Sequence, residues 1–93
     1  MSYDNQISDI APLESLTNLK LLSLGYNQIS DITPLGSLTD LVELSLNNNQ
    51  ISDVAPLKSM TKLDYLFLYD NPLTQEQKDE VKEALPSNCI INF

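Results

Sequence analysis

The pattern Leu-x-x-Leu-x-Leu-x-x-Asn-x-Ile/Leu recurs three times at a fixed interval, and it constrains the fold more than any other feature of the chain. It occupies residues 19–29, 41–51 and 63–73, so that its asparagine stands at every 22nd position, at Asn27, Asn49 and Asn71. A fixed period of about 20–50 residues indicates a repeat architecture in which each unit packs mainly on its two neighbours. The chain is therefore expected to form a solenoid of stacked units.

Apolar residues repeat with the same 22-residue period at seven places in each copy, and all of them are aliphatic or Met. One copy alone cannot bury such a series, but stacked copies place each residue on its equivalent above and below. The predicted core is therefore the set Ile7, Ile10, Leu13, Leu16, Leu19, Leu22, Leu24, Ile29, Ile32, Leu35, Leu38, Leu41, Leu44, Leu46, Ile51, Val54, Leu57, Met60, Leu63, Leu66 and Leu68.

A short strand is predicted in each copy, around 22–24, 44–46 and 66–68, because apolar residues there alternate with others at period 2. Strands that repeat in one direction build a parallel sheet. The asparagine that follows each strand is interpreted as structural rather than ligand-binding, because a buried amide can pair with backbone groups in adjacent turns. Asn27, Asn49 and Asn71 are thus predicted to form a hydrogen-bond ladder.

The returning segments 8–13, 30–35 and 52–57 share the pattern Ser-Asp-Ile/Val-x-Pro-Leu. Ser or Asp suits a helix N-cap, and Pro is tolerated in a first turn. The apolar spacing of three predicts short 3₁₀-like turns on the convex side of the solenoid. Asp9, Asp31 and Asp53 form an acidic column there. A calcium site remains an open alternative to the local capping role of each carboxylate, because hard cations take carboxylate oxygens.

The repeat pattern ends after residue 70, which divides the chain into repeats at 1–70 and a C-terminal cap at 71–93. Thr74 and Gln77 have the spacing of a capping box, and the apolar face that follows predicts a helix over about 74–85, ended by Pro86. A final strand over about 89–93 would turn Cys89, Ile91 and Phe93 inward. This cap would cover the last repeat.

The first copy is expected to be truncated, because the positions 22 residues before Leu22 and Leu24 are not leucines. Tyr3 and Asp4 offer little cover, so no N-terminal cap is expected. The open end predicts either the last part of a longer array or an engineered or excised fragment. Ile7, Ile10, Leu13 and Leu16 are expected to be partly open, because no earlier repeat stacks on them. An unpaired strand edge there invites another chain, so a homodimer through residues around 1–26 is expected.

Charge and composition narrow the functions. Of the 93 residues, 13 are acidic and five are lysine, giving a net charge of −8. Such a surface disfavours nucleic acid and anionic membranes, and no apolar run approaches the roughly 20 residues of a membrane-spanning helix. Cys89 is the only cysteine and there is no histidine, which argues against a nucleophile–base pair and a zinc site. No catalytic, metal-binding or cofactor-binding residue is predicted, and Cys89 is expected to be a small buried apolar residue.

The segments 5–19 and 27–41, which share 12 of 15 residues, closely resemble the 22-residue leucine-rich repeats of bacterial internalin-like proteins. They are also similar to the repeats of the same class in eukaryotic phosphatase regulators. Residues 71–93 are also similar to the closing cap of such proteins. The resemblance implies an α/β fold, a right-handed solenoid with its parallel β-sheet on the concave face, and a C-terminal cap of one α-helix and one strand. It implies protein binding on the concave face, no enzymatic activity, and an extracellular or cell-surface location if the parent is internalin-like.

The outward strand positions vary between copies, so recognition is predicted there. A non-catalytic scaffold that binds an unidentified protein partner on the concave sheet face is the first interpretation. The alternative is an engineered or excised scaffold without a natural ligand that self-associates through its N-terminal end. Exposed aromatic clusters are typical interface anchors, although these rings could also pack on one another. The candidate binding residues are Leu21, Ser23, Tyr26, Glu43, Ser45, Asn47, Tyr65, Phe67, Tyr69 and Asp70.

Overall fold

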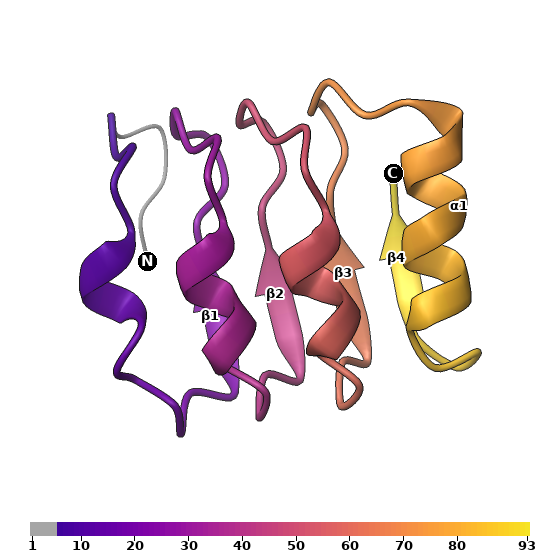
Figure 1. The fold of residues 1–93 in the computed structure, drawn as a ribbon, viewed down its shortest axis with the longest axis horizontal. Helices are drawn as coiled ribbons and strands as arrows, with labels where there is room; N and C mark the ends of the chain where they lie inside the picture. Colours follow the sequence, from indigo (N-terminus) through magenta and orange to yellow (C-terminus); the bar gives the residue numbers. More distant parts are fainter. Residues whose placement is uncertain (1–5) are drawn as a thin grey trace.

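The computed structural model describes residues 6–93 and consists of stacked repeats that each contribute one strand and one 3₁₀ helix. The strands form one layer and the helices the other, with α1 at the C-terminal end (Figure 1). In chain order the elements are η1 (Ala11–Leu13), β1 (Leu21–Ser23), η2 (Thr33–Ser37), β2 (Glu43–Ser45), η3 (Ala55–Ser59), β3 (Tyr65–Phe67), α1 (Gln75–Ala84) and β4 (Ile90–Asn92).

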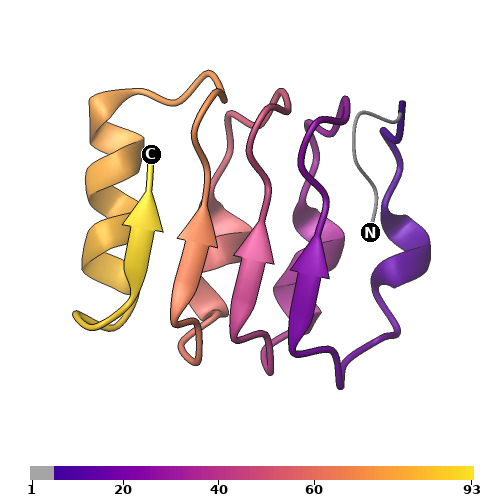
Figure 2. The ribbon, with the colours of Figure 1, turned by 180° about the vertical axis from the view of Figure 1, so that it is seen from behind.

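The four strands lie side by side in the order β1-β2-β3-β4, as Figure 2 shows from behind. All pairs are parallel, and Leu22 stands opposite Leu44, which in turn stands opposite Leu66. The sequence period of 22 is therefore also the register of the sheet. The last pair does not follow this period. Leu66 stands opposite Ile91, and the segment between them in the sequence includes α1. The predicted parallel sheet, 3₁₀ turns and helical cap are all confirmed.

The core lies between the two layers and is filled by the predicted apolar positions. Those of the second and third copies are all buried. In the first copy Ile10 and Leu24 are buried, whereas Ile7, Leu13, Leu19 and Leu22 are only partly buried. Ile10 was expected to be partly open, and its burial corrects that expectation. Leu16 is 45% exposed, because the second repeat covers only one side of the first.

The convex turns differ in detail from the expected caps. The N-cap residues of the 3₁₀ helices are Ile10, Ile32 and Val54, with no capping side chain. The preceding aspartate acts instead: an Asp Oδ1 accepts the backbone N–H two residues later, at 2.9–3.0 Å, in all three repeats. Each aspartate thus holds its turn from one position before the N-cap residue, and Pro occupies the first helical turn as expected.

The C-terminal end is closed by α1 and β4. The side chain of Thr74 accepts the N–H of Gln77, while the Gln77 side chain accepts the N–H of Thr74, which is the predicted capping box. The Gln77 amide also donates to the Ser52 carbonyl and so links the helix to the preceding repeat. Val81 is buried on the repeat side of the helix. Cys89, expected to be buried, is only partly buried, because it lies just before the edge strand β4.

The first five residues, including Tyr3 and Asp4, lie outside the described part of the chain. The expectation that there is no N-terminal cap concerns these residues and stays a prediction. Within residues 6–93, β1 pairs with β2 alone and is the first strand of the sheet. No helix in this part of the chain is long and apolar enough to cross a membrane.

Candidate functional site

The outward side chains of the sheet fall into rows that run across the strands, because the parallel register aligns equivalent positions. The first row joins Leu21, Glu43, Tyr65 and Ile90. Leu21 is 65% exposed, Tyr65 43% and Ile90 57%. Glu43 is exposed as well. Of the five large hydrophobic residues exposed in the described chain, three lie in this row. We call it the apolar–acidic row.

Ile90 was absent from the sequence-based candidates. Its exposure follows from the predicted inward direction of Cys89 and Ile91, since alternate strand residues face opposite sides. The C-terminal strand could therefore have been read as an extension of the binding surface as well as a cap. Its position opposite Tyr65 makes it part of the same stripe.

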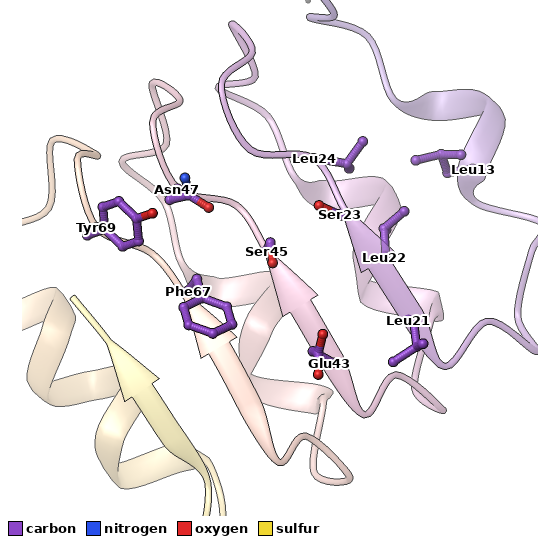
Figure 3. Close-up of a pocket in the computed structure, with 10 residues that line it drawn as sticks. All are labelled: Leu13, Leu21, Leu22, Ser23, Leu24, Glu43, Ser45, Asn47, Phe67 and Tyr69. Carbon is purple, nitrogen blue, oxygen red and sulfur yellow. The ribbon is translucent and has the colours of Figure 1, made fainter. Parts of the chain in front are cut away.

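The second row contains Ser23, Ser45, Phe67 and Asn92. The two serines and Phe67 are half-buried. The short side chains of the two serines project less from the sheet than the Phe67 ring does. Figure 3 shows these residues from one side of the sheet. This part of the sheet face is therefore shaped by small residues on β1 and β2 and by an aromatic ring on β3.

The third row follows the strand ends and contains Gly25, Asn47 and Tyr69. Asn47 was expected to point to solvent, but it is only 4% exposed. Its side chain lies over Gly25, where an added Cβ would stand 2.9 Å from Asn47 Oδ1. Asn47 Nδ2 also donates to Asn48 Oδ1 at 2.9 Å. Because Gly25 has no side chain, Asn47 lies in the surface rather than projecting from it, and this corrects the expectation that its side chain points to solvent.

One residue beyond that row, the backbone takes a left-handed conformation at Tyr26, Asn48 and Asp70, with φ of 61°, 59° and 59°. Asn and Asp tolerate this region better than most residues, and a tyrosine there is uncommon. Asn48 Nδ2 donates to Asp70 Oδ2 at 3.0 Å, across a sequence separation of 22. These three residues thus form the rim of the sheet. Tyr26 and Asp70 were predicted candidates, and both are exposed.

A shallow hollow of about 700 Å³ lies against β1, β2 and β3. Phe67 and Tyr69 border one end, and Leu13, Leu22 and Leu24 border the other, beside η1 (Figure 3). The hollow therefore joins the outward sheet face to the partly open apolar end of the first repeat. The predicted candidates Leu21, Ser23, Glu43, Ser45 and Asn47 lie between these ends.

The asparagine column lies under the rim and pairs with the backbone. Asn49 Oδ1 accepts the Ile29 N–H at 3.0 Å, and Asn49 Nδ2 donates to the carbonyls of Leu24 and Leu46, both at 3.0 Å. Asn71 repeats these contacts one copy later, and Asn27 Oδ1 accepts the Ile7 N–H. Each amide thus binds its own turn and the turn of the preceding copy.

Two salt bridges in the described part of the chain lie away from the outward rows of the sheet. Lys58 pairs with Glu80 at 3.0 Å. Lys62 pairs with Asp40 at 2.9 Å. The Lys62 contact, and to a smaller extent the Lys20 charge, holds the pKa of Asp40 below its ordinary value of 3.8. The hydrogen bonds from Thr33, first from its side chain and then from its backbone, lower the pKa of Asp31.

The carboxylates of the acidic column have local hydrogen-bond partners, and the Cys89 thiol lies in an environment that favours its protonated form. The Asp9, Asp31 and Asp53 carboxylates each hold a turn of their own repeat. Residues 6–93 contain no cluster of three or more potential metal ligands. Burial, with a contribution from the Asp64 carboxylate, raises the pKa of the Cys89 thiol, which disfavours the reactive thiolate.

Comparisons with known proteins agree with this geometry. The family model described as leucine-rich repeats (2 copies) matches residues 1–37 and 39–79. A search of curated proteins finds no match. Among solved structures, an internalin (inlF) from Listeria monocytogenes is 44% identical in sequence, with a TM-score of 0.74. The match covers 76% of this chain and 21% of the internalin chain. An internalin C2 (inlC2) from the same species is 42% identical with a TM-score of 0.83, covering 92% and 36%.

A leucine-rich repeat protein from Leptospira interrogans is 28% identical with a TM-score of 0.85, covering 98% of this chain and 24% of its own. The chain thus spans 21–36% of the length of these three proteins. The repeat model covers most of the chain, and the asparagine column and short 3₁₀ turns occur in every described copy. The chain therefore belongs to the leucine-rich repeat family, with repeats similar to those of bacterial internalins.

Proposed function

We propose that this chain is a non-catalytic protein-interaction module that binds a protein partner on its concave sheet face. The observation that supports it is the apolar–acidic row, in which Leu21, Tyr65 and Ile90 expose large apolar side chains along one line of the sheet. Exposed groups of large apolar side chains bordered by polar residues often mark protein-interaction sites. Leucine-rich repeat proteins are in general protein-interaction scaffolds, and the proposal assigns that role to this surface.

The proposed contact residues are those that project from the sheet and its rim. They are Leu21, Ser23, Tyr26, Glu43, Ser45, Tyr65, Phe67, Tyr69 and Asp70. Asn47 supports this surface from below, because it is buried against Gly25. In this proposal residues 1–70 form the binding repeats and residues 71–93 the cap that completes the sheet through β4.

The test compares capture of protein partners by the wild-type chain and by a variant with Tyr65, Phe67 and Tyr69 changed to Ser. The matched control changes three exposed residues of α1, Glu76, Lys82 and Glu83, to Ser. A partner of the sheet face is captured by the wild type and the control and lost by the triple variant. Partners that persist through the triple variant, with its melting transition intact, would move the site to another surface.

A single Tyr65→Ser variant guards against loss of fold in the triple variant. Tyr65 is the most exposed of the three aromatic residues, so its removal leaves the core untouched. We expect it to weaken a sheet-face partner, since exposed tyrosines are frequent energetic hot spots. Unchanged capture by both variants contradicts the proposal.

Self-association is a second candidate, and the surface of the first repeat favours it. Leu16 and Leu21 are exposed there, and β1 offers an edge that no other strand of residues 6–93 covers. In this reading the chain is an engineered or excised scaffold whose principal partner is a second copy of itself. The two candidates share Leu21, but Tyr65 belongs only to the sheet-face candidate and the free edge of β1 only to self-association, so mutations at these two places can separate them.

A further inference from the structure

The charges of the sheet face have one sign, which sets it apart from the rest of the molecule. Among the outward and rim positions of the four strands, the charged side chains are Glu43 and Asp70, both acidic. The five lysines lie outside these rows: Lys20 directly precedes β1, Lys58 is in η3, Lys62 follows it, and Lys78 and Lys82 are in α1. The salt bridges found within residues 6–93 join lysines to Asp40 and Glu80, away from the sheet rows.

Glu43 stands between apolar neighbours in the apolar–acidic row. Leu21 lies opposite it on β1 and Tyr65 opposite it on β3. Adjacent strands are about 4.8 Å apart, so the carboxylate has an apolar group one strand away on each side. Asp70, by contrast, already accepts a hydrogen bond from Asn48 at the rim. Glu43 is therefore the acidic group of this face that is best placed to receive a ligand cation.

We propose that the apolar–acidic row binds a protein segment in which a lysine or arginine is flanked on both sides by apolar side chains. The basic group pairs with Glu43, one apolar side chain covers Leu21, and the other covers Tyr65 and Ile90. The row spans three strand spacings, about 14 Å, which an extended segment of four or five residues crosses at about 3.3 Å per residue. This inference rests on the proposed function, because it specifies the partner of the same surface.

The neighbouring rings strengthen the preference for a cation. A lysine or arginine within about 6 Å of an aromatic face is attracted to it, by about 0.5–1 kcal/mol at exposed sites. The Tyr65 side chain lies next to Glu43, so one basic group can contact the carboxylate and the ring together. An uncharged or acidic segment would leave the Glu43 carboxylate without a partner under the apolar contacts.

Other occupants fit this face less well. A second copy would bring another chain of net charge −8 and a second Glu43 onto the same surface. Nucleic acid and anionic membranes carry the same sign of charge as Glu43 and Asp70. A basic protein segment is the occupant whose charge and apolar groups both match the row.

The test uses a displayed library of random 12-residue peptides, selected on the wild-type chain. We expect enrichment of peptides with Lys or Arg between apolar residues. In calorimetry, Glu43→Gln weakens the selected peptides about two- to fivefold, as for an exposed ion pair, and Glu43→Lys weakens them more than tenfold. Selection on Glu43→Lys shifts the preference at that position toward Asp or Glu. The control Glu83→Lys, which makes the same charge change on α1, leaves binding within about twofold.

Each alternative result has a distinct meaning. Peptides without a basic residue that are nevertheless lost in Tyr65→Ser overturn this inference and leave the proposed function standing. Peptides insensitive to both Tyr65→Ser and Glu43→Lys overturn both. Equal weakening by Glu83→Lys and Glu43→Lys shows that only net charge matters, and it overturns the inference. A wild-type dimer that dissociates in Tyr65→Ser would assign the face to a second copy and also overturn it.

Discussion

At the scale of single residues, the asparagine column shows how a turn without regular structure is held. The Asn49 amide accepts the Ile29 N–H and donates to three carbonyls, those of Leu24, Leu46 and Asn47. These groups lie near the core, where an unpaired N–H or carbonyl is costly. One side chain therefore pairs backbone groups that a strand or helix would pair elsewhere, and these groups belong to two adjacent copies.

We expect Asn49→Ala to lower the free energy of unfolding by about 1–3 kcal/mol, the usual cost of leaving a buried polar group unpaired. The Ile29 N–H would lose its side-chain acceptor. Asn18→Ala, at an exposed position, is the control and should change stability by less than about 0.5 kcal/mol. Urea unfolding measures both, and equal midpoints would contradict a structural role for Asn49.

The contact between Gly25 and Asn47 gives a second prediction at this scale. In Gly25→Ala the new Cβ would lie 2.9 Å from Asn47 Oδ1, which is too close for the present geometry. We expect Gly25→Ala to destabilise the chain by about 1–3 kcal/mol, the range for overpacking. Combined with Asn47→Ala, the cost should be smaller than the sum of the two single changes. Strict additivity in thermal unfolding would show that the two side chains do not compete for space.

Residues that repeat at the 22-residue period could be predicted from the sequence, and residues governed by a neighbouring copy could not. Leu44 and Leu66 occupy the core because every copy has a leucine there. Asn47 was misplaced because strand alternation alone points it outward, whereas the absence of a side chain at Gly25 lets it turn inward. The exposed row was predicted in part, since Leu21, Glu43 and Tyr65 were named but Ile90 was not.

At the scale of elements, the C-terminal helix is stabilised both by a local capping box and by tertiary packing. Thr74 and Gln77 fix the first turn through a reciprocal pair of hydrogen bonds, and Val81 and Leu85 face the core. A ten-residue helix is marginal alone, so its stability depends on both the cap and the packing. The capping box and the apolar spacing were visible in the sequence, which is why the helix was predicted to within one residue at each end.

We expect Thr74→Ala to lower the free energy of unfolding by about 0.5–2 kcal/mol, because the Gln77 N–H would lose its acceptor. Thr74→Ser should restore most of that stability, since a hydroxyl oxygen remains. Circular dichroism during thermal unfolding measures the difference. Equal melting temperatures for Thr74→Ala and Thr74→Ser would show that the capping box contributes nothing to the fold.

At the scale of the whole molecule, the two ends are unequal. Helix α1 and strand β4 cover the last repeat, whereas the first repeat leaves Leu16 and Leu21 exposed. Each described copy is stabilised chiefly by its neighbours, so the residues of the first copy have fewer contacts than their equivalents. This inequality follows from the number and order of the repeats, and it was predictable once the period was known.

We predict that two copies of the chain form a two-fold homodimer through β1. In a parallel strand, alternate residues bond to opposite sides. Leu24 donates to Ser45, so the Ser23 N–H faces the edge of β1 that no strand of residues 6–93 covers. An unpaired edge can receive the same edge of a second copy. Ser23→Pro removes that N–H, whereas Ser23→Ala keeps it and serves as the control. Sedimentation should show a dimer for the wild type and Ser23→Ala, and a monomer for Ser23→Pro.

Salt provides an independent check on this dimer. Two chains of net charge −8 repel each other, and added salt screens that repulsion, so association through β1 should strengthen between about 0.05 and 0.5 M salt. Binding of a basic segment at Glu43 should weaken over the same range, because the interacting charges there are opposite. A wild-type chain that stays monomeric at all salt and protein concentrations would contradict self-association, yet it would leave the sheet face free to bind a partner.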